Sequence, residues 1–300
     1  MILKVPLQIV RGFVMGAADV VPGVSGGTVA LVFGIYTDLV AAVHQGAVAL
    51  GRFVRLDVKG GMAELRRVDW LFLLPLLAGV GLAVVTLAHL IETLLEEQPV
   101  RMSAVFFGLV LASIVVAWGY VRRRDARTLA VLVVVAAVTF ALLGLRSGPV
   151  ADPSLGYVFL AGAVAICAMI LPGISGSFLL LMLGVYDSIL GAVTDRDLAV
   201  AAVFALGCVV GLALFSSLLD WALKHHHDLV MGGLIGLMVG SLRVLWPWPD
   251  GTGSTSIGAP DGDWPAVVVL GVVAVAVVLL VARLAGTRDA RRSAKKALSR

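Results

Sequence analysis

Long apolar runs, separated by short charged segments, form the main pattern of this chain. A helix needs about 20 apolar residues to cross a bilayer. Runs of roughly this length predict six membrane-spanning helices, at residues 70–91, 102–121, 129–145, 198–223, 229–246 and 264–284. Two further apolar regions, 7–50 and 155–193, are each interrupted near the middle by small and polar residues.

Each interrupted region contains a cluster of proline, glycine and serine. The clusters run from Pro22 to Gly27 and from Pro172 to Ser177. Proline lacks the N–H that a helix requires and glycine tolerates left-handed backbone, so each cluster should end one helix and begin another. The arm before the first cluster has about 15 residues and reaches only ~22 Å at 1.5 Å per residue. We therefore interpret both regions as re-entrant helical hairpins, which return to the side from which they enter.

The composition agrees with a membrane location. Apolar residues make up 60% of the 300 residues and charged residues 14%, whereas ordinary soluble domains have roughly 45–50% and about 25%. The mean hydropathy is +1.03, which is more than a single hydrophobic core requires. The pattern and the composition together predict an all-α polytopic membrane protein, with residues 1–300 in one membrane domain.

Basic residues gather in alternate connections between the apolar segments. With two re-entrant hairpins, one side of the membrane receives Arg52, Arg55, Lys59, Arg66, Arg67, Arg122, Arg123, Arg124, Arg127, Lys224 and the basic tail 286–300. By the positive-inside rule this side is cytoplasmic and holds both termini. We expect the tail to be attracted to the anionic lipids of the inner leaflet. Because aromatic residues do not interleave with a basic region, a nucleic-acid partner is excluded.

A shift of 150 residues superposes the two hairpins. Gly12, Val14, Ala18, Pro22, Gly23, Ser25, Gly26, Leu31, Gly34 and Tyr36 match Gly162, Val164, Ala168, Pro172, Gly173, Ser175, Gly176, Leu181, Gly184 and Tyr186. Three crossings separate the hairpins, so the second unit enters from the opposite side. We predict two inverted repeats, 7–145 and 155–285, each a re-entrant hairpin followed by three transmembrane helices. This architecture is typical of transporters, although a duplication retained only for packing would leave the same pattern.

The hairpin tips carry the chemistry of an anion site. A helix start has unsatisfied N–H groups and the positive end of the helix dipole, and two starts that face a shared cavity would favour phosphate oxygens. The candidates are Gly23, Gly26, Gly27, Gly173 and Gly176 through their amides, and Ser25, Thr28, Ser175 and Ser177 through their hydroxyls. The alternative is that these small residues only allow close helix packing.

Charged residues at membrane depth are costly and are therefore functional candidates. Arg11 could hold a phosphate or lie at the inner interface. Asp19 could take a proton or another cation, or could tether the backbone at the break. Tyr36 and Tyr186, which match between the repeats, are either packing residues or ligands. We predict no metal site and no cofactor, and a proton or sodium as the coupling ion of any coupled transport.

An enzyme is the less favoured interpretation. A Gly-x-Ser-Gly pattern surrounds both Ser25 and Ser175 and can house a serine nucleophile. A hydrolase requires a base beside that serine. His89 lies towards one end of its helix, and we expect no histidine at the depth of the tips. A nucleophile repeated in two opposed units is also not expected.

At these residues the chain resembles the bacterial polyprenyl-phosphate translocases of the PopT type. The resemblance rests on Met15 to Asp19, Pro22 to Thr28 and Gly34 to Tyr36, and in the second copy on Pro172 to Phe178 and Gly184 to Tyr186. The second copy departs from the first at Met169, which matches Asp19, and at Ser177, which matches Gly27. Any coupling role of Asp19 would therefore be asymmetric.

The resemblance implies that the protein returns undecaprenyl phosphate from the outer to the inner leaflet of the bacterial cytoplasmic membrane. The phosphate would lie between the tips with Arg11 nearby, and the prenyl tail would stay in lipid while the repeats rock. Two alternatives stay open: an ion-coupled transporter of a small soluble anion, and a non-transporting membrane scaffold.

Overall fold

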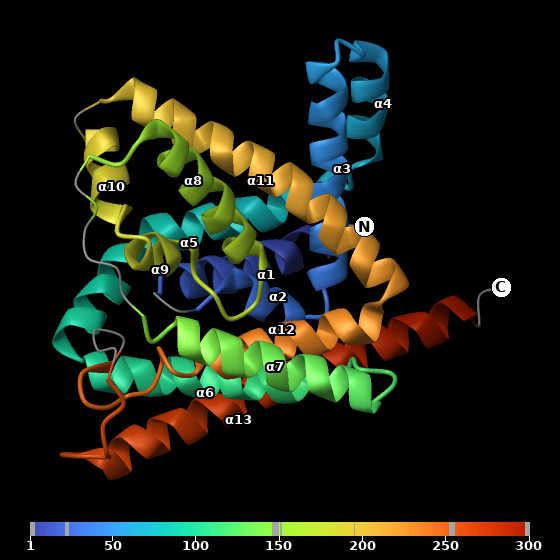
Figure 1. Ribbon diagram of the computed structural model, residues 1–300. Coiled ribbons are helices and arrows are strands. Elements are labelled where there is room, and N and C mark those ends of the chain that lie inside the picture. The colour runs from blue at the N-terminus through green and yellow to red at the C-terminus, as the bar shows by residue number, and fades with distance from the viewer. Residues whose placement is uncertain are drawn as a thin grey trace.

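The computed structural model describes residues 4–21, 24–145, 150, 152–194, 196–251 and 256–297. These residues form thirteen α-helices (Figure 1). The helices are α1 (Lys4–Asp19), α2 (Gly26–Val32), α3 (Tyr36–Val54), α4 (Val58–Arg67), α5 (Trp70–Glu97), α6 (Pro99–Trp118), α7 (Ala126–Leu142), α8 (Leu155–Ile170), α9 (Gly176–Met182), α10 (Tyr186–Thr194), α11 (Leu198–His225), α12 (His227–Ser241) and α13 (Trp264–Ala297). The all-α prediction is confirmed.

Among the described residues, four helices are long and apolar enough to cross a membrane. They are α5, α6, α11 and the segment Trp264–Leu284 of α13. The other two predicted spans are shorter in the structure: α7 has 17 residues and α12 has 15. The chain after Ser241 continues as turns towards Pro247, where proline cannot donate the N–H that a longer helix would need. The fold is that of a polytopic membrane protein.

The long helices pack in pairs that join distant parts of the chain. In one hairpin unit α1 packs on α5, and in the other α8 packs on α11, while α6 pairs with α13 and α7 with α12. Glycines allow these backbones to approach closely. A Cβ at Gly79 of α5 would overlap the carbonyl of Ile9, and one at Gly207 of α11 would overlap the carbonyl of Phe159. The predicted apolar runs thus associate through small residues.

Each interrupted region forms three helices instead of the predicted two arms. After the first tip, α2 ends at Val32, and the chain turns at Gly34, whose φ is +66°, before α3 begins at Tyr36. The second region repeats the break at Gly184, whose φ is +70°. Glycine adopts this left-handed conformation without the penalty that a Cβ brings. The prediction of a single return arm up to residue 50 is therefore wrong. The chain turns at Gly34, and α2 and α3 are separate helices on either side of the turn.

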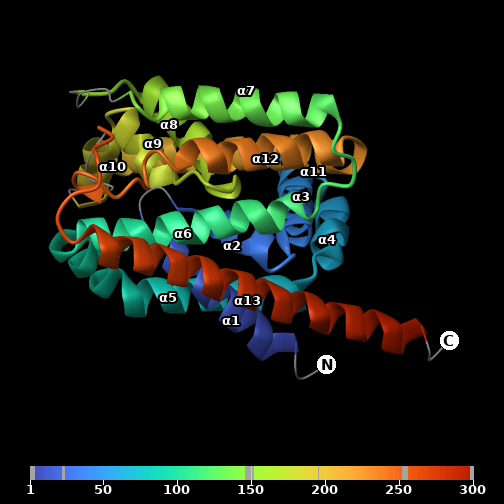
Figure 2. The ribbon, with the colours of Figure 1, turned by 90° about the horizontal axis from the view of Figure 1, so that it is seen from below.

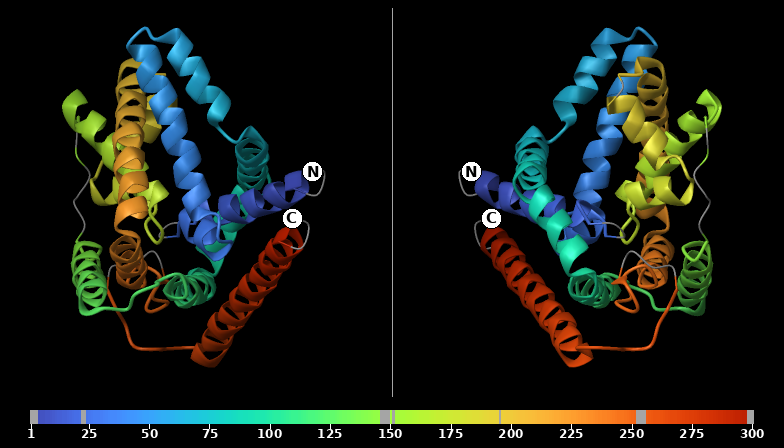
Figure 3. Two further views of the ribbon diagram at one scale, coloured as in Figure 1. Left: turned by 90° about the vertical axis from the view of Figure 1, so that its right-hand side faces the viewer. Right: turned by 90° about the vertical axis from the view of Figure 1, so that its left-hand side faces the viewer.

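The α3 and α4 helices form an arch between α2 and α5 (Figure 3). Helix α3 packs against both α4 and α11. The segment that holds Lys59, Arg66 and Arg67 was expected as a connecting loop, but it forms α4. Asp57 caps this helix by accepting a hydrogen bond from the N–H of Gly60 at 2.8 Å, a preferred helix start.

The two ends of the molecule differ in charge. The N-terminus, the α3–α4 arch, the α6–α7 and α11–α12 connections and the far end of α13 lie at one end (Figures 1 and 2). We call this the basic end, because it holds Arg52, Arg55, Lys59, Arg66, Arg67, Arg122, Arg123, Arg124 and Lys224. The opposite, acidic end holds Glu96, Glu97, Asp197, Asp250, Asp261 and Asp263. Helix α1 starts at the basic end and α8 starts at the acidic end (Figure 1).

The predicted basic tail 286–300 continues α13 as a helix as far as Ala297, and residues 298–300 lie outside the described residues. The hydrophobic core surrounds the first tip. Val21, Val24, Leu76, Ile235 and Met238 are almost completely buried there. The centre of the packing is therefore also the place where the first hairpin turns.

Candidate functional site

The first tip satisfies its own helix start. Ser25 is the N-cap of α2, and its hydroxyl accepts a hydrogen bond from the N–H of Gly27 at 3.1 Å. The carboxylate of Asp19, the last residue of α1, accepts the N–H of Gly26. Two of the orphan donors of this helix are thus already bonded to side chains. In this conformation the start of α2 is occupied by the protein's own carboxylate.

The structure brings the two hairpin tips into direct contact. The Ser25 hydroxyl donates to the carbonyl of Met169 at 3.2 Å, and the N–H of Gly173 donates to Oγ1 of Thr28 at 2.9 Å. Gly27 packs against the second hairpin so closely that a Cβ would lie 2.7 Å from the carbonyl oxygen of Ile170. Ser25 and Thr28 are buried. Polar groups at the centre of a membrane protein are therefore paired between two segments that lie about half the chain apart.

A cavity of about 300 Å³ lies beside the second tip. Its polar lining comes from Asp19, Ser175, Gly176 and Ser177, and its apolar lining comes from α8, α9 and α11. The hydroxyls of Ser175 and Ser177 lie 2.8 Å apart, and Ser175 makes no side-chain cap on α9. We call this space the tip cavity. Of the predicted site residues, these four share one space that a small group could enter.

The other predicted residues lie apart from the tip cavity. The guanidinium of Arg11 lies over the ring of Phe33, 5.8 Å from its centre, on the side of the first hairpin where α2 ends. Gly23 lies outside the described residues, as does Pro22. Tyr36 and Tyr186 each begin the helix that follows a left-handed glycine. Tyr186 packs against the small cluster that contains Val185.

A second and larger cavity, of about 590 Å³, opens at the basic end. It lies where the end of α2 and the start of α3 meet the α6–α7 connection and the α11–α12 connection. Its polar lining residues are Tyr36, Thr37, Asp38, Tyr120, Arg122, Asp220, Lys224 and His227. We call it the basic-end cavity. The sequence identified Arg122 and Lys224 only as markers of membrane orientation.

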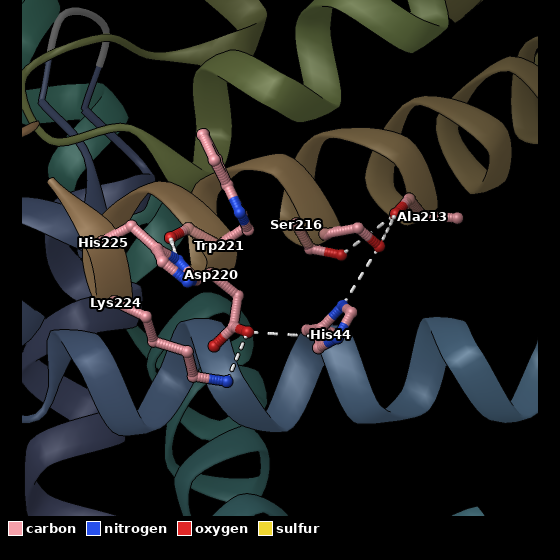
Figure 4. A network of polar contacts seen from close by, with 8 residues as sticks. His44, Ala213, Ser216, Asp220, Trp221, Lys224 and His225 are labelled. Carbon is pink, nitrogen blue, oxygen red and sulfur yellow. Dashed lines mark hydrogen bonds and ion pairs between the residues drawn. The ribbon is translucent and has the colours of Figure 1, made fainter.

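A polar network joins α3 to α11 beside this cavity (Figure 4). Nδ1 of His44 lies 3.0 Å from the hydroxyl of Ser217, and its Nε2 lies 3.9 Å from Oδ2 of Asp220. The ammonium of Lys224 donates to the same carboxylate at 2.6 Å. The sequence analysis did not single out His44, because its partners are more than 170 residues away and no local motif signals the contact.

A model of the VCA0040-like family, described as undecaprenyl phosphate translocase-like, matches residues 15–258. The chain belongs to this family. The match covers most of the chain and includes both hairpin tips, and it confirms the resemblance seen in the paired motifs. The translocase-like family is one of transporters, so the serine-hydrolase interpretation of Ser25 and Ser175 is excluded.

Two curated proteins show the extent of the similarity. A polyprenyl-phosphate transporter of Vibrio cholerae is 40% identical over 242 residues, which are 80% of this chain and 77% of that protein. A polyprenyl-phosphate transporter of Staphylococcus aureus is 28% identical over 258 residues, 80% of this chain and 86% of the relative. No solved structure matches the chain.

Proposed function

We propose that the chain translocates undecaprenyl phosphate from the outer to the inner leaflet of the bacterial cytoplasmic membrane. Membership of the translocase-like family supports this proposal, as does the similarity to the polyprenyl-phosphate transporters of Vibrio cholerae and Staphylococcus aureus. The charge pattern supports the orientation, with the basic end and both termini in the cytoplasm. The lipid carrier would enter at the acidic end and leave at the basic end.

The contact between the two hairpin tips is the observation that carries the mechanism. Helix α1 reaches this contact from the basic end and α8 reaches it from the acidic end, as inverted repeats 7–145 and 155–285 would require. The pairing of α1 with α5 has its counterpart in α8 with α11. Two similar units that meet at the centre can exchange conformations and expose one site alternately to each side. Ser25 and Thr28 hold the tips together in one such conformation.

The tip cavity is the proposed place of the phosphate. The hydroxyls of Ser175 and Ser177 and the amide of Gly176 can donate hydrogen bonds to phosphate oxygens. Met169 lines this cavity and is 48% exposed on the apolar surface, so the cavity opens towards lipid. A prenyl chain could thus remain in the bilayer while its phosphate lies at the tips. Separation of the tips would free Ser25 and Thr28 to join the site.

Asp19 is the proposed group for ion coupling. Its carboxylate lines the tip cavity and carries the same sign of charge as a phosphate. A phosphate bound in the tip cavity would lie beside this carboxylate, and two like charges close together in a medium of low dielectric repel each other strongly. A proton or a sodium ion that neutralises Asp19 would remove this repulsion when the phosphate binds. Loss of the neutralising ion at the other side would then favour release.

A leaflet-resolved assay tests the proposed function. Purified protein is reconstituted into liposomes that carry a fluorescent undecaprenyl phosphate, and the appearance of the phosphate on the opposite leaflet is followed over time. Acceleration over protein-free liposomes is the expected result. Equal rates with and without protein would contradict the proposal. Transport of a soluble phosphate instead of the lipid would favour the small-anion carrier, and transport of neither would favour the scaffold.

A further inference from the structure

The basic-end cavity has an amphipathic lining. Its lining includes Arg122 and Lys224 together with the hydroxyl-bearing Tyr36, Thr37 and Tyr120. The same lining includes the apolar side chains of Leu31, Leu223 and Met231. A volume of about 590 Å³ is much larger than a phosphate group needs. The lining therefore suits a phosphate that is attached to a hydrocarbon chain better than it suits a free phosphate ion.

Two long helices begin at this cavity. Tyr36, Thr37 and Asp38 form the first turn of α3, which has 19 residues, and His227 is the first residue of α12, which has 15. Neither helix start has a side-chain cap hydrogen bond. Both starts therefore present the positive end of a helix dipole to the same space, and N–H groups in such positions bind anions.

The hydroxyl of Tyr36 is an independent sign of a ligand. Tyr36 lines the cavity but is only 3% exposed. Its hydroxyl has no hydrogen-bond partner among the residues that the structure describes. A buried polar group without a partner costs free energy, so its retention calls for a partner that arrives from outside the chain. The hydroxyl itself is closed off from the cavity, so the oxygen of a bound phosphate would accept this hydrogen bond once the side chain turns towards the ligand.

The charges of the cavity permit an anion. Asp220 already has a partner, because its carboxylate accepts a hydrogen bond from Lys224 at 2.6 Å and faces His44 (Figure 4). Asp38 is exposed, so water and salt screen its charge. The side chain of Arg122 makes no ion pair within the described part of the chain. Its guanidinium can therefore bind two oxygens of a phosphate at once.

The loop that carries Arg122 is held in place. The N–H groups of Arg122 and Arg123 donate to the carboxylate of Asp228 at 2.9 and 3.2 Å. These bonds fix the backbone of the α6–α7 connection against the start of α12, so only the Arg122 side chain has to be ordered when a ligand binds. Helix α2 links this place to the tips, since it begins next to Ser25 and its residue Leu31 lines the cavity. Seven helical residues span about 10 Å.

We infer that the basic-end cavity is a second binding site, for the phosphate monoester of a lipid, formed by Arg122, Tyr36 and the starts of α3 and α12. It deepens the proposed function and rests on it for its place in transport: the lipid phosphate released from the tips is held here before it enters the leaflet at the basic end. The site is distinct from the tip cavity, with which it shares no lining residue.

Equilibrium binding of farnesyl phosphate to the purified full chain in detergent tests this site. Arg122→Gln should weaken binding about tenfold, the factor for the loss of one charge-assisted hydrogen-bonded pair. Tyr36→Phe should also weaken it about tenfold, as for one hydrogen bond to a charged phosphate oxygen. The matched controls are Arg123→Gln, an exposed neighbour in the same loop, and Tyr157→Phe, whose hydroxyl donates to the carbonyl of Leu183 outside the cavity. Both controls should bind like the wild type.

Thermal unfolding without ligand separates binding from packing. Tyr36→Phe removes a hydroxyl that has no partner in the described structure, so its unfolding midpoint should not fall below that of the wild type. If Arg122→Gln and Tyr36→Phe both bind farnesyl phosphate as the wild type does, the inference is overturned. Because Arg122 is exposed, its substitution keeps the test valid even if Tyr36→Phe unfolds.

Competing probes identify the ligand class. Inorganic phosphate should compete weakly, because it cannot use Leu31, Leu223 and Met231. Phosphatidylglycerol should also compete weakly, because a diester carries a single charge. Competition by either one at the strength of farnesyl phosphate would overturn the assignment to a lipid phosphate monoester.

The liposome assay separates this site from the proposed function. If the wild type translocates undecaprenyl phosphate but both variants bind farnesyl phosphate normally, the inferred site is wrong and the proposed function stands. If the wild type binds farnesyl phosphate through Arg122 but does not translocate undecaprenyl phosphate, the binding site stands and its proposed role in transport is wrong.

Discussion

Small polar residues at the centre of the molecule pair the two hairpins and, in the proposed mechanism, also bind the phosphate. Ser25 and Thr28 connect the hairpins through hydrogen bonds, and Gly27 allows the approach that these bonds need. In a bilayer such groups have no water as a substitute partner. The same hydroxyls are therefore suited to exchange a protein partner for a phosphate when the tips separate. In this mechanism Ser25 and Thr28 would serve both the packing of the hairpins and the transport of the phosphate.

Gly27→Ala should disrupt the contact between the tips. The added Cβ would lie 2.7 Å from the carbonyl oxygen of Ile170, and overpacking of this kind typically costs about 1–3 kcal/mol. We expect a lower thermal unfolding midpoint and slower transport. Gly51→Ala is the matched control, because a Cβ there meets nothing within 4 Å. Equal midpoints for Gly27→Ala and the wild type would contradict the close packing of the tips.

Asp19→Asn tests whether Asp19 couples transport to an ion in addition to accepting the N–H of Gly26 at the start of α2. The amide oxygen of asparagine can still accept the N–H of Gly26, since asparagine is also a preferred helix cap, but it has no charge to neutralise. We expect a folded protein whose transport rate no longer depends on a proton or sodium gradient. The measurement compares liposome rates with and without each gradient. Asp263→Asn, at an exposed ion pair with Arg101, serves as control, and a gradient dependence that survives Asp19→Asn would remove the coupling role.

At the level of helices, the break after α2 determines which residues line the basic-end cavity. Gly34 turns the chain so that α3 starts at the basic-end cavity instead of extending α2. Tyr36 and the first turn of α3 come to line that space because of this turn. A continuous return arm would have carried these residues past it. If the basic-end cavity binds the lipid phosphate as inferred above, the break serves that binding site.

Gly34→Ala should weaken this turn. Its φ of +66° is unfavourable for a residue with a Cβ, at a cost of roughly 1–2 kcal/mol. The added atom would also lie 3.2 Å from the hydroxyl of Tyr120. We expect a lower unfolding midpoint in a thermal denaturation series. Gly81→Ala, inside α5 with nothing within 4 Å of the new Cβ, should be neutral or stabilising, and the opposite order of midpoints would contradict the assigned turn.

Local sequence signals predicted the helix breaks at the two tips, but only part of the helices that follow them and of the cavities. The clusters around Ser25 and Ser175 carry proline and glycine, whose backbone effects are local, so both breaks were predictable. The second break at Gly34 was missed because apolar residues continue on both sides of it. The basic-end cavity joins Tyr36, Arg122 and Lys224, and no spacing rule connects residues so far apart. The sequence analysis interpreted the charges of Arg122 and Lys224 only as markers of membrane orientation, so it did not predict this cavity.

At the scale of the whole molecule, helix pairing and charge act together. The α6–α13 and α7–α12 pairs cross between the two halves of the chain, and the main hydrophobic core contains residues of both halves. The tips meet inside this frame, and the charged ends lie on opposite sides of it (Figures 1 and 2). A lipid phosphate would therefore pass a central polar contact within an apolar surface and then reach a basic cavity at one end.

Transport by Ser175→Leu in the leaflet-resolved liposome assay tests the central claim most directly. Leucine would fill the tip cavity and remove one of its hydroxyl donors, so the appearance of undecaprenyl phosphate on the opposite leaflet should slow to the rate of protein-free liposomes. Membrane insertion should be unchanged. Thr86→Leu, on an exposed face of α5 where the hydroxyl bonds only its own helix, should transport as the wild type does. Full transport by Ser175→Leu would contradict a site at the hairpin tips.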